Sequence, residues 1–123
     1  MTDGFSNKEE ELVDRLIKTG LNKNVAKTLV YISGRDEIKS REIESEIGLR
    51  QPEVSIAVQN LRDLGWVEKD KLKKEGKGRP THVYNLSKPI EQIVGEISKE
   101  IDNEINKLEK DKTKLKELTL NIF

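Results

Sequence analysis

The residues that could carry covalent or metal chemistry are almost absent from this 123-residue sequence. It contains no cysteine and a single histidine, His82, which excludes disulfides, zinc–thiolate sites, cysteine nucleophiles and histidine-based metal clusters. Gly76 and Gly78 lack the Gly-x-x-x-x-Gly-Lys-Ser/Thr spacing of a phosphate-binding loop. We therefore expect a protein that is not an enzyme and that holds no metal or cofactor.

The basic residues could instead bind an anionic polymer. The chain carries 23 basic and 23 acidic side chains, so its formal net charge is zero. Residues 69–79 nevertheless hold six basic and two acidic side chains, whereas residues 1–68 hold ten basic and 13 acidic ones. A basic segment of this kind can contact phosphates although the whole chain is neutral.

The composition limits the size of the core that must position these charges. Only 33% of the residues are apolar and 37% are charged, so the core is small and much of the chain lies in solvated, amphipathic elements. No run of 18 apolar residues is present, which argues against a transmembrane helix. Residues 1–11 are polar and lack the apolar segment of a secretory signal. We expect a cytoplasmic protein without membrane contact.

Two amphipathic helices are predicted before residue 35. Ser6 and Glu9 form a capping box in front of the first helix, which Gly20 ends. Asn22 can cap the second helix, which Gly34 ends. Apolar residues recur at helical spacing in both segments.

A pair of short helices joined by a tight turn follows. We predict that Ser40 caps the first of them and that Gly48 ends it. Pro52 is predicted at the first position of the second, where its missing N–H costs nothing, and Gly65 ends that helix. This arrangement is typical of a helix-turn-helix. The face of its second helix that is not needed for the core presents Arg50, Gln51, Glu53, Ser55, Ile56, Gln59 and Asn60.

The apolar pattern then changes to that of a β-hairpin. Residues 66–73 and 81–86 are predicted as its strands, with Trp66 anchoring the core where the first one begins. The turn-prone, basic segment 76–80 joins them. A hairpin directly after the second helix makes the helix-turn-helix winged.

Three segments carry a family resemblance: residues 50–55, residues 64–67, and Gly-Lys-Gly-Arg-Pro at 76–80. Over about residues 22–86 the chain resembles archaeal winged helix-turn-helix transcriptional regulators of the TrmB-like, ArsR-like and MarR-like groups. The resemblance implies a dimer on duplex DNA with the wing beside the minor groove. We find no effector domain like that of the larger sugar-sensing members, which argues against small-molecule sensing; the identity of any effector stays open.

The residue types on the exposed helix face suit base recognition. Arginine can pair with guanine in two hydrogen bonds, and glutamine or asparagine with adenine. Glu53 would repel phosphates, so we expect it to cap its helix or to orient Arg50. The predicted DNA-binding residues are Ser40, Arg50, Gln51, Ser55, Gln59, Asn60, Lys73, Lys74, Lys77, Arg79 and Thr81.

The C-terminal segment from Pro89 to Ile122 reads as one long helix with apolar residues every seven positions. Glu104 and Asp111 interrupt the second row of the repeat. A helix of about 30 residues is too long to bury this stripe on so small a domain, which predicts a homodimer whose parallel or antiparallel geometry stays open. The predicted dimerisation residues are Val94, Ile97, Ile101, Ile105, Leu108, Leu115, Leu118 and Ile122.

The sequence thus predicts an α+β, mainly α fold. Residues 1–86 would form a winged helix-turn-helix DNA-binding domain and residues 87–123 a helix for dimerisation. The function we predict is a sequence-specific, double-stranded DNA-binding transcriptional regulator. An interaction module of a transcription or chromosome-organising complex is the alternative, which the balanced net charge and the exposed Ile56 favour.

The basic wing yields a testable prediction. Lys77→Ala should lower the slope of log affinity against log salt by about 0.9 and weaken specific and random DNA alike, because one phosphate contact is lost. Arg79→Ala should also reduce any preference for A·T-rich flanks, because an arginine inside the minor groove reads its width. A gel-shift titration at two salt concentrations measures both effects. Unchanged affinity in both variants would favour the interaction module.

Overall fold

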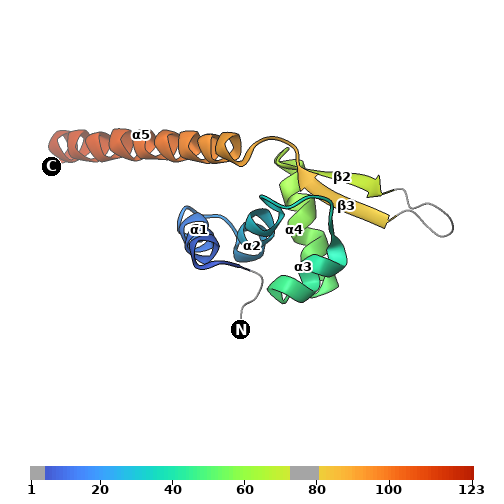
Figure 1. Cartoon of the computed structure of the whole chain (residues 1–123). Helices are drawn as coiled ribbons and strands as arrows, with labels where there is room; N and C mark the ends of the chain where they lie inside the picture. The colour runs from blue at the N-terminus through green and yellow to red at the C-terminus, as the bar shows by residue number, and fades with distance from the viewer. Residues whose placement is uncertain (1–4, 73–80) are drawn as a thin grey trace. The chain divides into compact units, whose positions relative to one another are not determined.

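The structure is a computed structural model, and it describes residues 5–72 and 81–123 (Figure 1). The chain divides into two compact units, Met1–Ile90 and Glu91–Phe123. The elements are α1 (Asn7–Lys18), α2 (Lys23–Ile32), β1 (Ile38–Lys39), α3 (Ser40–Ile47), α4 (Gln51–Asp63), β2 (Val67–Leu72), β3 (Thr81–Leu86) and α5 (Ile90–Ile122).

The first two helices begin where the sequence predicts. The Ser6 backbone N–H donates to Glu9 Oε1 (2.9 Å), and the Glu9 N–H donates to Ser6 Oγ (3.2 Å), which completes the capping box of α1. Asn22 Oδ1 accepts hydrogen bonds from the N–H groups of Asn24 and Val25, at 2.9 and 3.3 Å, and so caps α2. One N-terminal amide of α1 and two of α2, which have no partner inside the helix, are satisfied in this way.

The cap predicted for α3 was wrong. Ser40 is the first residue of the helix, and Lys39 is the N-cap without a side-chain cap of its own. The N–H of Lys39 donates instead to Glu42 Oε1, at 3.2 Å. The reason for the shift is that Lys39 already pairs with Val83 as part of β1, so the extended backbone that precedes the helix ends one residue earlier than Ser40.

The start of α4 also lies one residue earlier than predicted. Arg50 is the N-cap, Gln51 is the first helical residue, and Pro52 is the second. Proline is still tolerated there, because the first-turn amides of a helix have no partner inside it. The carboxy-terminal end of α4 agrees with the prediction. Leu64 is its C-cap, and Gly65 follows with a φ of 79°.

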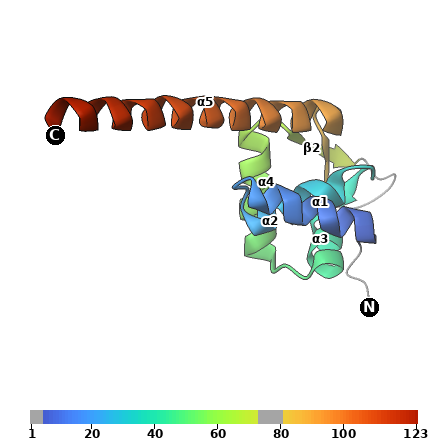
Figure 2. The ribbon, with the colours of Figure 1, turned by 90° about the vertical axis from the view of Figure 1, so that its left-hand side faces the viewer.

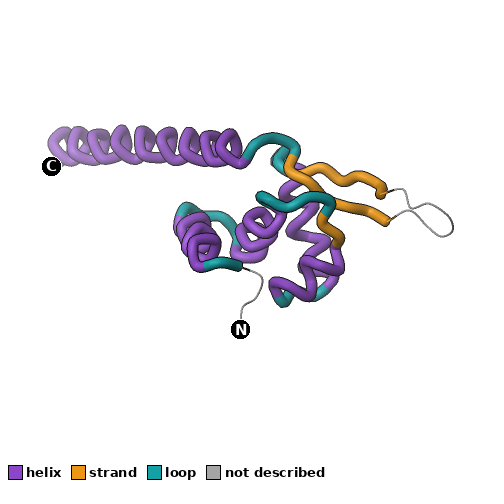
Figure 3. The backbone as a smooth tube through the Cα atoms, in the orientation of Figure 1, coloured by secondary structure: helices purple, strands orange, loops and turns teal. Residues whose placement is uncertain are grey.

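A three-stranded antiparallel sheet with strand order β1-β3-β2 completes the first unit (Figure 3). The predicted hairpin is confirmed, and its register runs from Val67 opposite Leu86 to Leu72 opposite Thr81. In β1, Ile38 pairs with Tyr84. The sequence marks Ile38 only as an apolar position, because a two-residue strand is too short to show alternation.

The core of the first unit is arranged around α2, which packs against α1, α3, α4 and β3 (Figure 2). Seven of its ten residues are buried. Trp66 is buried where the chain enters β2, as predicted. The buried apolar residues that the other elements contribute include Val13, Leu16, Ile43, Ile47, Val54, Val58, Leu61, Val67 and Val83.

The predicted fold class is confirmed: helices predominate, a small sheet forms a hairpin wing, and a long C-terminal helix follows. α5 has 33 residues and is therefore about 50 Å long. None of the described helices is both long and apolar enough to cross a membrane.

Thr28 in α2 supplies a prediction about stability. Its side chain is fully buried, and its Oγ1 has no hydrogen-bond partner among the described residues. An unsatisfied buried hydroxyl costs about 1–3 kcal/mol, and valine keeps the shape without the polar atom. Thr28→Val should therefore raise the free energy of unfolding by about 1 kcal/mol. Urea denaturation measures this, and a loss of stability would mean that the hydroxyl has a partner.

Candidate nucleic-acid interface

The turn between α3 and α4 sets the direction in which α4 leaves α3. Gly48 closes α3 with a φ of 70°, a conformation that suits glycine. The N–H of Leu49 donates to the carbonyl oxygen of Glu44 (3.2 Å), which returns the chain against the end of α3. The extended Arg50 then leads directly into α4. The turn is three residues long, as in a helix-turn-helix.

One face of α4 is buried and the other is open. Val54, Ala57, Val58 and Leu61 lie in the core, as predicted for the inner face. The exposed residues include all five predicted DNA-binding positions of this region, namely Arg50, Gln51, Ser55, Gln59 and Asn60. Ile56 lies among them with 64% of its surface exposed.

The polar side chains of this face differ in their freedom to bind a ligand. Gln59 Nε2 donates to Asp63 Oδ1 at 2.9 Å, and its Oε1 accepts from Arg62 Nη1 at 3.4 Å. The side chains of Gln51 and Ser55 make no hydrogen bond within the described residues. Gln51 and Ser55 in the amino-terminal half of α4, together with Asn60 further along, are therefore available for a partner, whereas Gln59 is engaged within the helix.

Glu53 has the capping role predicted for it. Its Oε1 accepts a hydrogen bond from the Arg50 backbone N–H at 2.8 Å. The carboxylate also lies in the first turn, where the partial positive charge of the helix N-terminus stabilises it. Its repulsion of a phosphate is thereby reduced, while the Arg50 side chain remains exposed.

The β2–β3 hairpin has two electrostatically different faces. Because side chains alternate along a strand, Lys69 and Lys71 lie on one face and Glu68 and Asp70 on the other. Lys71 is directly opposite His82 in the register. All five side chains are exposed. One face of the hairpin is thus basic and the other acidic, so only the first suits a phosphate backbone.

The remaining predicted DNA-binding residues fall outside α4. Ser40 and Thr81 are half-buried; Ser40 follows Lys39, which pairs with Val83 of the strand that Thr81 begins. Lys73, Lys74, Lys77 and Arg79 lie outside the described residues. The structure therefore adds Lys69, Lys71 and His82 to the candidates. The alternation of charges at positions 68–71 is the sequence signal that could have identified the basic face.

The described residues contain no group of three histidine, cysteine, aspartate or glutamate side chains that could hold a metal ion. What the described part of the site offers is hydrogen-bonding groups and positive charge.

Comparison with known proteins identifies this arrangement. Residues 19–77, which contain the helix-turn-helix and the first strand of the hairpin, match the sequence model of the MarR family. This segment is similar to the winged helix-turn-helix of the MarR family. The family resemblance predicted from residues 50–55, 64–67 and 76–80 is confirmed in this respect. The match does not extend to α5.

One solved structure shows a similar fold over most of the chain. The archaeal chromatin protein TrmBL2, whose structure is described as showing a novel mode of DNA binding, is 19% identical with a TM-score of 0.54. That similarity covers 94% of this chain and 44% of TrmBL2, so the chain spans less than half the length of that relative. NMB1585, a MarR family regulator from Neisseria meningitidis, is 18% identical with a TM-score of 0.45, covering 93% and 94% of the two chains. No curated protein matches the sequence.

The basic face of the hairpin gives a prediction within the described residues. Lys71→Ala should lower the slope of log affinity against log salt by about 0.9, because one phosphate contact is lost. Random and specific duplexes should weaken alike. Fluorescence anisotropy over a salt series measures the slope, and Lys8→Ala, an exposed lysine in the first turn of α1, is the control. Equal slopes for the two variants would remove the hairpin face from the interface.

Proposed function

We propose that this protein is a transcription regulator that binds double-stranded DNA as a homodimer. In this proposal α4 enters the major groove, the hairpin contacts the backbone, and α5 joins the two copies. Regulation would follow from occupying a promoter, with no chemical step. The observation that carries the proposal is the open amino-terminal half of α4 beside a hairpin with one basic face, in a MarR-type winged helix-turn-helix.

Base recognition is assigned to the start of α4. A recognition helix reads base edges mainly with residues of its amino-terminal half. Arg50 and Gln51 lie there, exposed, and Ser55 follows one turn later. Arginine would read guanine and glutamine would read adenine. Gln59 has a smaller part, because both ends of its amide are engaged by Asp63 and Arg62.

The exposed Ile56 fits this proposal and also supports a second candidate function. In a major groove, an apolar side chain can contact the thymine methyl group. On a protein-binding surface, the same side chain would be an anchor. The second candidate is therefore a winged-helix module of a transcription or chromosome-organising complex, with α4 contacting protein. Ile56→Ala would weaken DNA binding at thymine-containing sites only in the first case.

The homodimer is supported by the amphipathic character of α5. Of the eight predicted dimerisation residues, the six that follow here are exposed: Val94, Ile105, Leu108, Leu115, Leu118 and Ile122. Ile97 and Ile101 are half-buried. Two linked recognition helices would bind two half-sites together, which raises affinity through effective concentration.

Gln51 and Gln59 form a matched pair that tests the recognition helix. Gln51→Ala should cost about 1–3 kcal/mol on the specific site and little on random DNA, because a base contact is removed. Gln59→Ala should cost less, because its amide is already engaged within the helix. The specific site is first obtained by selection from random duplexes, and both variants are then titrated on it. Equal losses on specific and random DNA would reassign Gln51 to phosphate contact. Failure to select any sequence would favour the interaction module.

A further inference from the structure

Between residues 103 and 114, α5 sorts its charged residues by face. A helix turns by about 100° per residue, so six residues of this segment fall within about one third of its circumference. All six side chains are exposed, all can donate a hydrogen bond, and none is acidic. They are Asn103, Asn106, Lys107, Lys110, Thr113 and Lys114. We call these six residues the lysine face.

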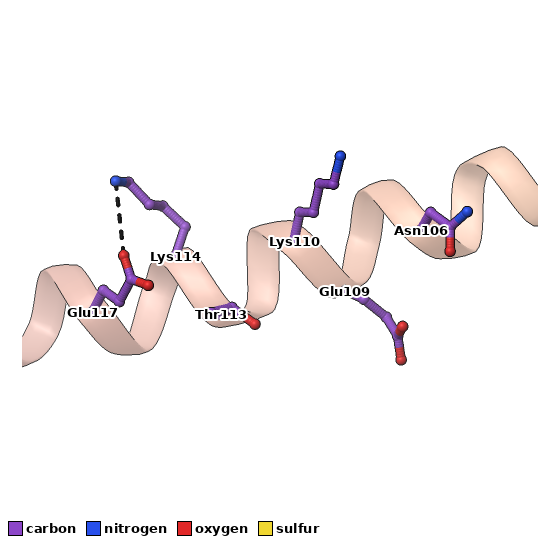
Figure 4. A pocket seen from close by; sticks show the side chains of 6 residues that line it. All are labelled: Asn106, Glu109, Lys110, Thr113, Lys114 and Glu117. Carbon is purple, nitrogen blue, oxygen red and sulfur yellow. Dashed lines mark ion pairs between the residues drawn. The ribbon is translucent and has the colours of Figure 1, made fainter.

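The acidic residues of the same segment lie outside the lysine face. Glu104 and Asp111 border it on one side and Glu109 on the other. Figure 4 shows Lys110 and Lys114 extending from the same side of the helix, whereas Glu109 points away from them. The side chains in Figure 4 all stand on one helix, so they enclose no cavity. The lysine face therefore suits an extended ligand and not a small molecule held in a pocket.

The three ammonium groups of this face are available to an outside partner. Within the part of the chain that the structure describes, Lys107 and Lys110 form no ion pair. Lys114 Nζ lies 3.9 Å from Glu117 Oε1, and both side chains are more than half exposed. An exposed pair of this kind contributes little to stability, so a stronger anion can take the place of Glu117.

We propose that the lysine face binds the phosphate backbone of double-stranded DNA, as a contact separate from α4 and the hairpin. The proposal rests on the DNA binding of the proposed function and extends it to the second unit. Lysine, asparagine and threonine side chains all donate hydrogen bonds to phosphate oxygens, and such contacts carry no sequence information. The contact would therefore raise the affinity for any duplex.

The spacing of the lysines suits a duplex. Lys107 and Lys114 are about 10 Å apart along the helix axis, with Lys110 between them. Double-stranded DNA carries one phosphate for about every 1.7 Å of its axis, so the three ammonium groups can reach separate phosphates. Asn103 extends the same face by about 6 Å. The lysine face is thus long enough to contact several phosphates.

The lysine face lies on the side of α5 opposite its apolar row, whose residues recur every seven positions. In that row Leu108 is 61% exposed and Leu115 is 67% exposed. A partner that covers the apolar row would leave the lysine face open. DNA contact by α5 is therefore compatible with the proposed homodimer.

An anionic membrane suits α5 less well than DNA does. A helix that lies on a membrane buries its apolar row, so the residues that flank this row meet the headgroups. In α5 the flanking residues include Glu104 and Asp111, which anionic headgroups would repel. The lysine face would then point away from the lipid.

Two double variants of the full-length protein separate the position of a lysine from its charge. Lys110→Gln with Lys114→Gln removes two charges from the lysine face. Lys112→Gln with Lys116→Gln removes two charges from the same helix, but on the side of the apolar row, and is the matched control. Glutamine has nearly the helix propensity of lysine. Circular dichroism and light scattering check that both variants keep the helix content and the oligomeric state of the native protein.

Fluorescence anisotropy on a random-sequence duplex over a salt series measures the contact. We expect the lysine-face variant to lower the slope of log affinity against log salt by about 1.8, because two phosphate contacts are lost at about 0.9 each. The control variant should leave the slope unchanged. A selected specific duplex should weaken by the same factor as the random one.

Two results would overturn the proposal. An unchanged slope in the lysine-face variant means that this face contacts no phosphate and serves another partner, such as an acidic protein. Equal decreases in both double variants mean that only the total charge of the chain matters. If Lys71→Ala of the hairpin lowers the slope while the lysine-face variant does not, the proposed function stands and only the contact by α5 fails. A native protein that binds no duplex DNA removes both.

Discussion

The burial of α2 is the constraint on which the first unit depends. This helix has seven buried residues out of ten, and it contacts α1, α3, α4 and β3. A helix buried on most sides must be apolar nearly all round, and it then fixes the positions of every element that covers it. Because α4 buries its inner face here, its outer face is left exposed at a defined angle. The direction of this exposed face thus follows from how the small core is filled.

A charged cluster fastens the end of α2 to the start of α1. Arg35 Nη1 lies 3.2 Å from Glu9 Oε2 and donates to the Tyr31 carbonyl oxygen (2.8 Å), while the guanidinium lies 4.2 Å from the centre of the Tyr31 ring. Burial raises the pKa of Glu9, but the Ser6 backbone hydrogen bond and the Arg35 charge outweigh it, so the pKa lies below its usual value. The stabilisation is therefore complete above the unfolded pKa and is lost as the pH falls through the folded one. At neutral pH the cluster is intact, so α1 covers α2 under the conditions in which DNA would be bound.

The sequence predicts features that depend on a repeating pattern or on residues close together in the chain. The caps at Ser6 and Asn22 are local, since each side chain reaches only two or three residues along the chain, and both predictions were confirmed. The start of α3 was misplaced by one residue because the tertiary pairing of Lys39 with Val83 sets where the helix begins. The start of α4 was also misplaced by one residue, although its capping contact between Glu53 and the Arg50 N–H is local. The placing of His82 on the same face as Lys71 depends on a register that only the paired strands define. The engagement of Gln59 by Asp63 and Arg62 depends on side-chain rotamers, which no sequence pattern specifies.

The zero net charge of the chain is compatible with DNA binding because the charges are sorted by face. Glu68 and Asp70 balance Lys69 and Lys71 in the total charge, but they lie on the other face of the hairpin and would point away from a phosphate backbone bound to the two lysines. Screening over about 8–10 Å separates the two faces at physiological salt. In the proposed complex, long-range attraction of the neutral chain to DNA would therefore be weak, and attraction would arise mainly where the basic face contacts the phosphates. In the proposed complex the acidic face also disfavours every orientation in which the hairpin is turned over, so charge sorting contributes to the direction of docking as well as to affinity.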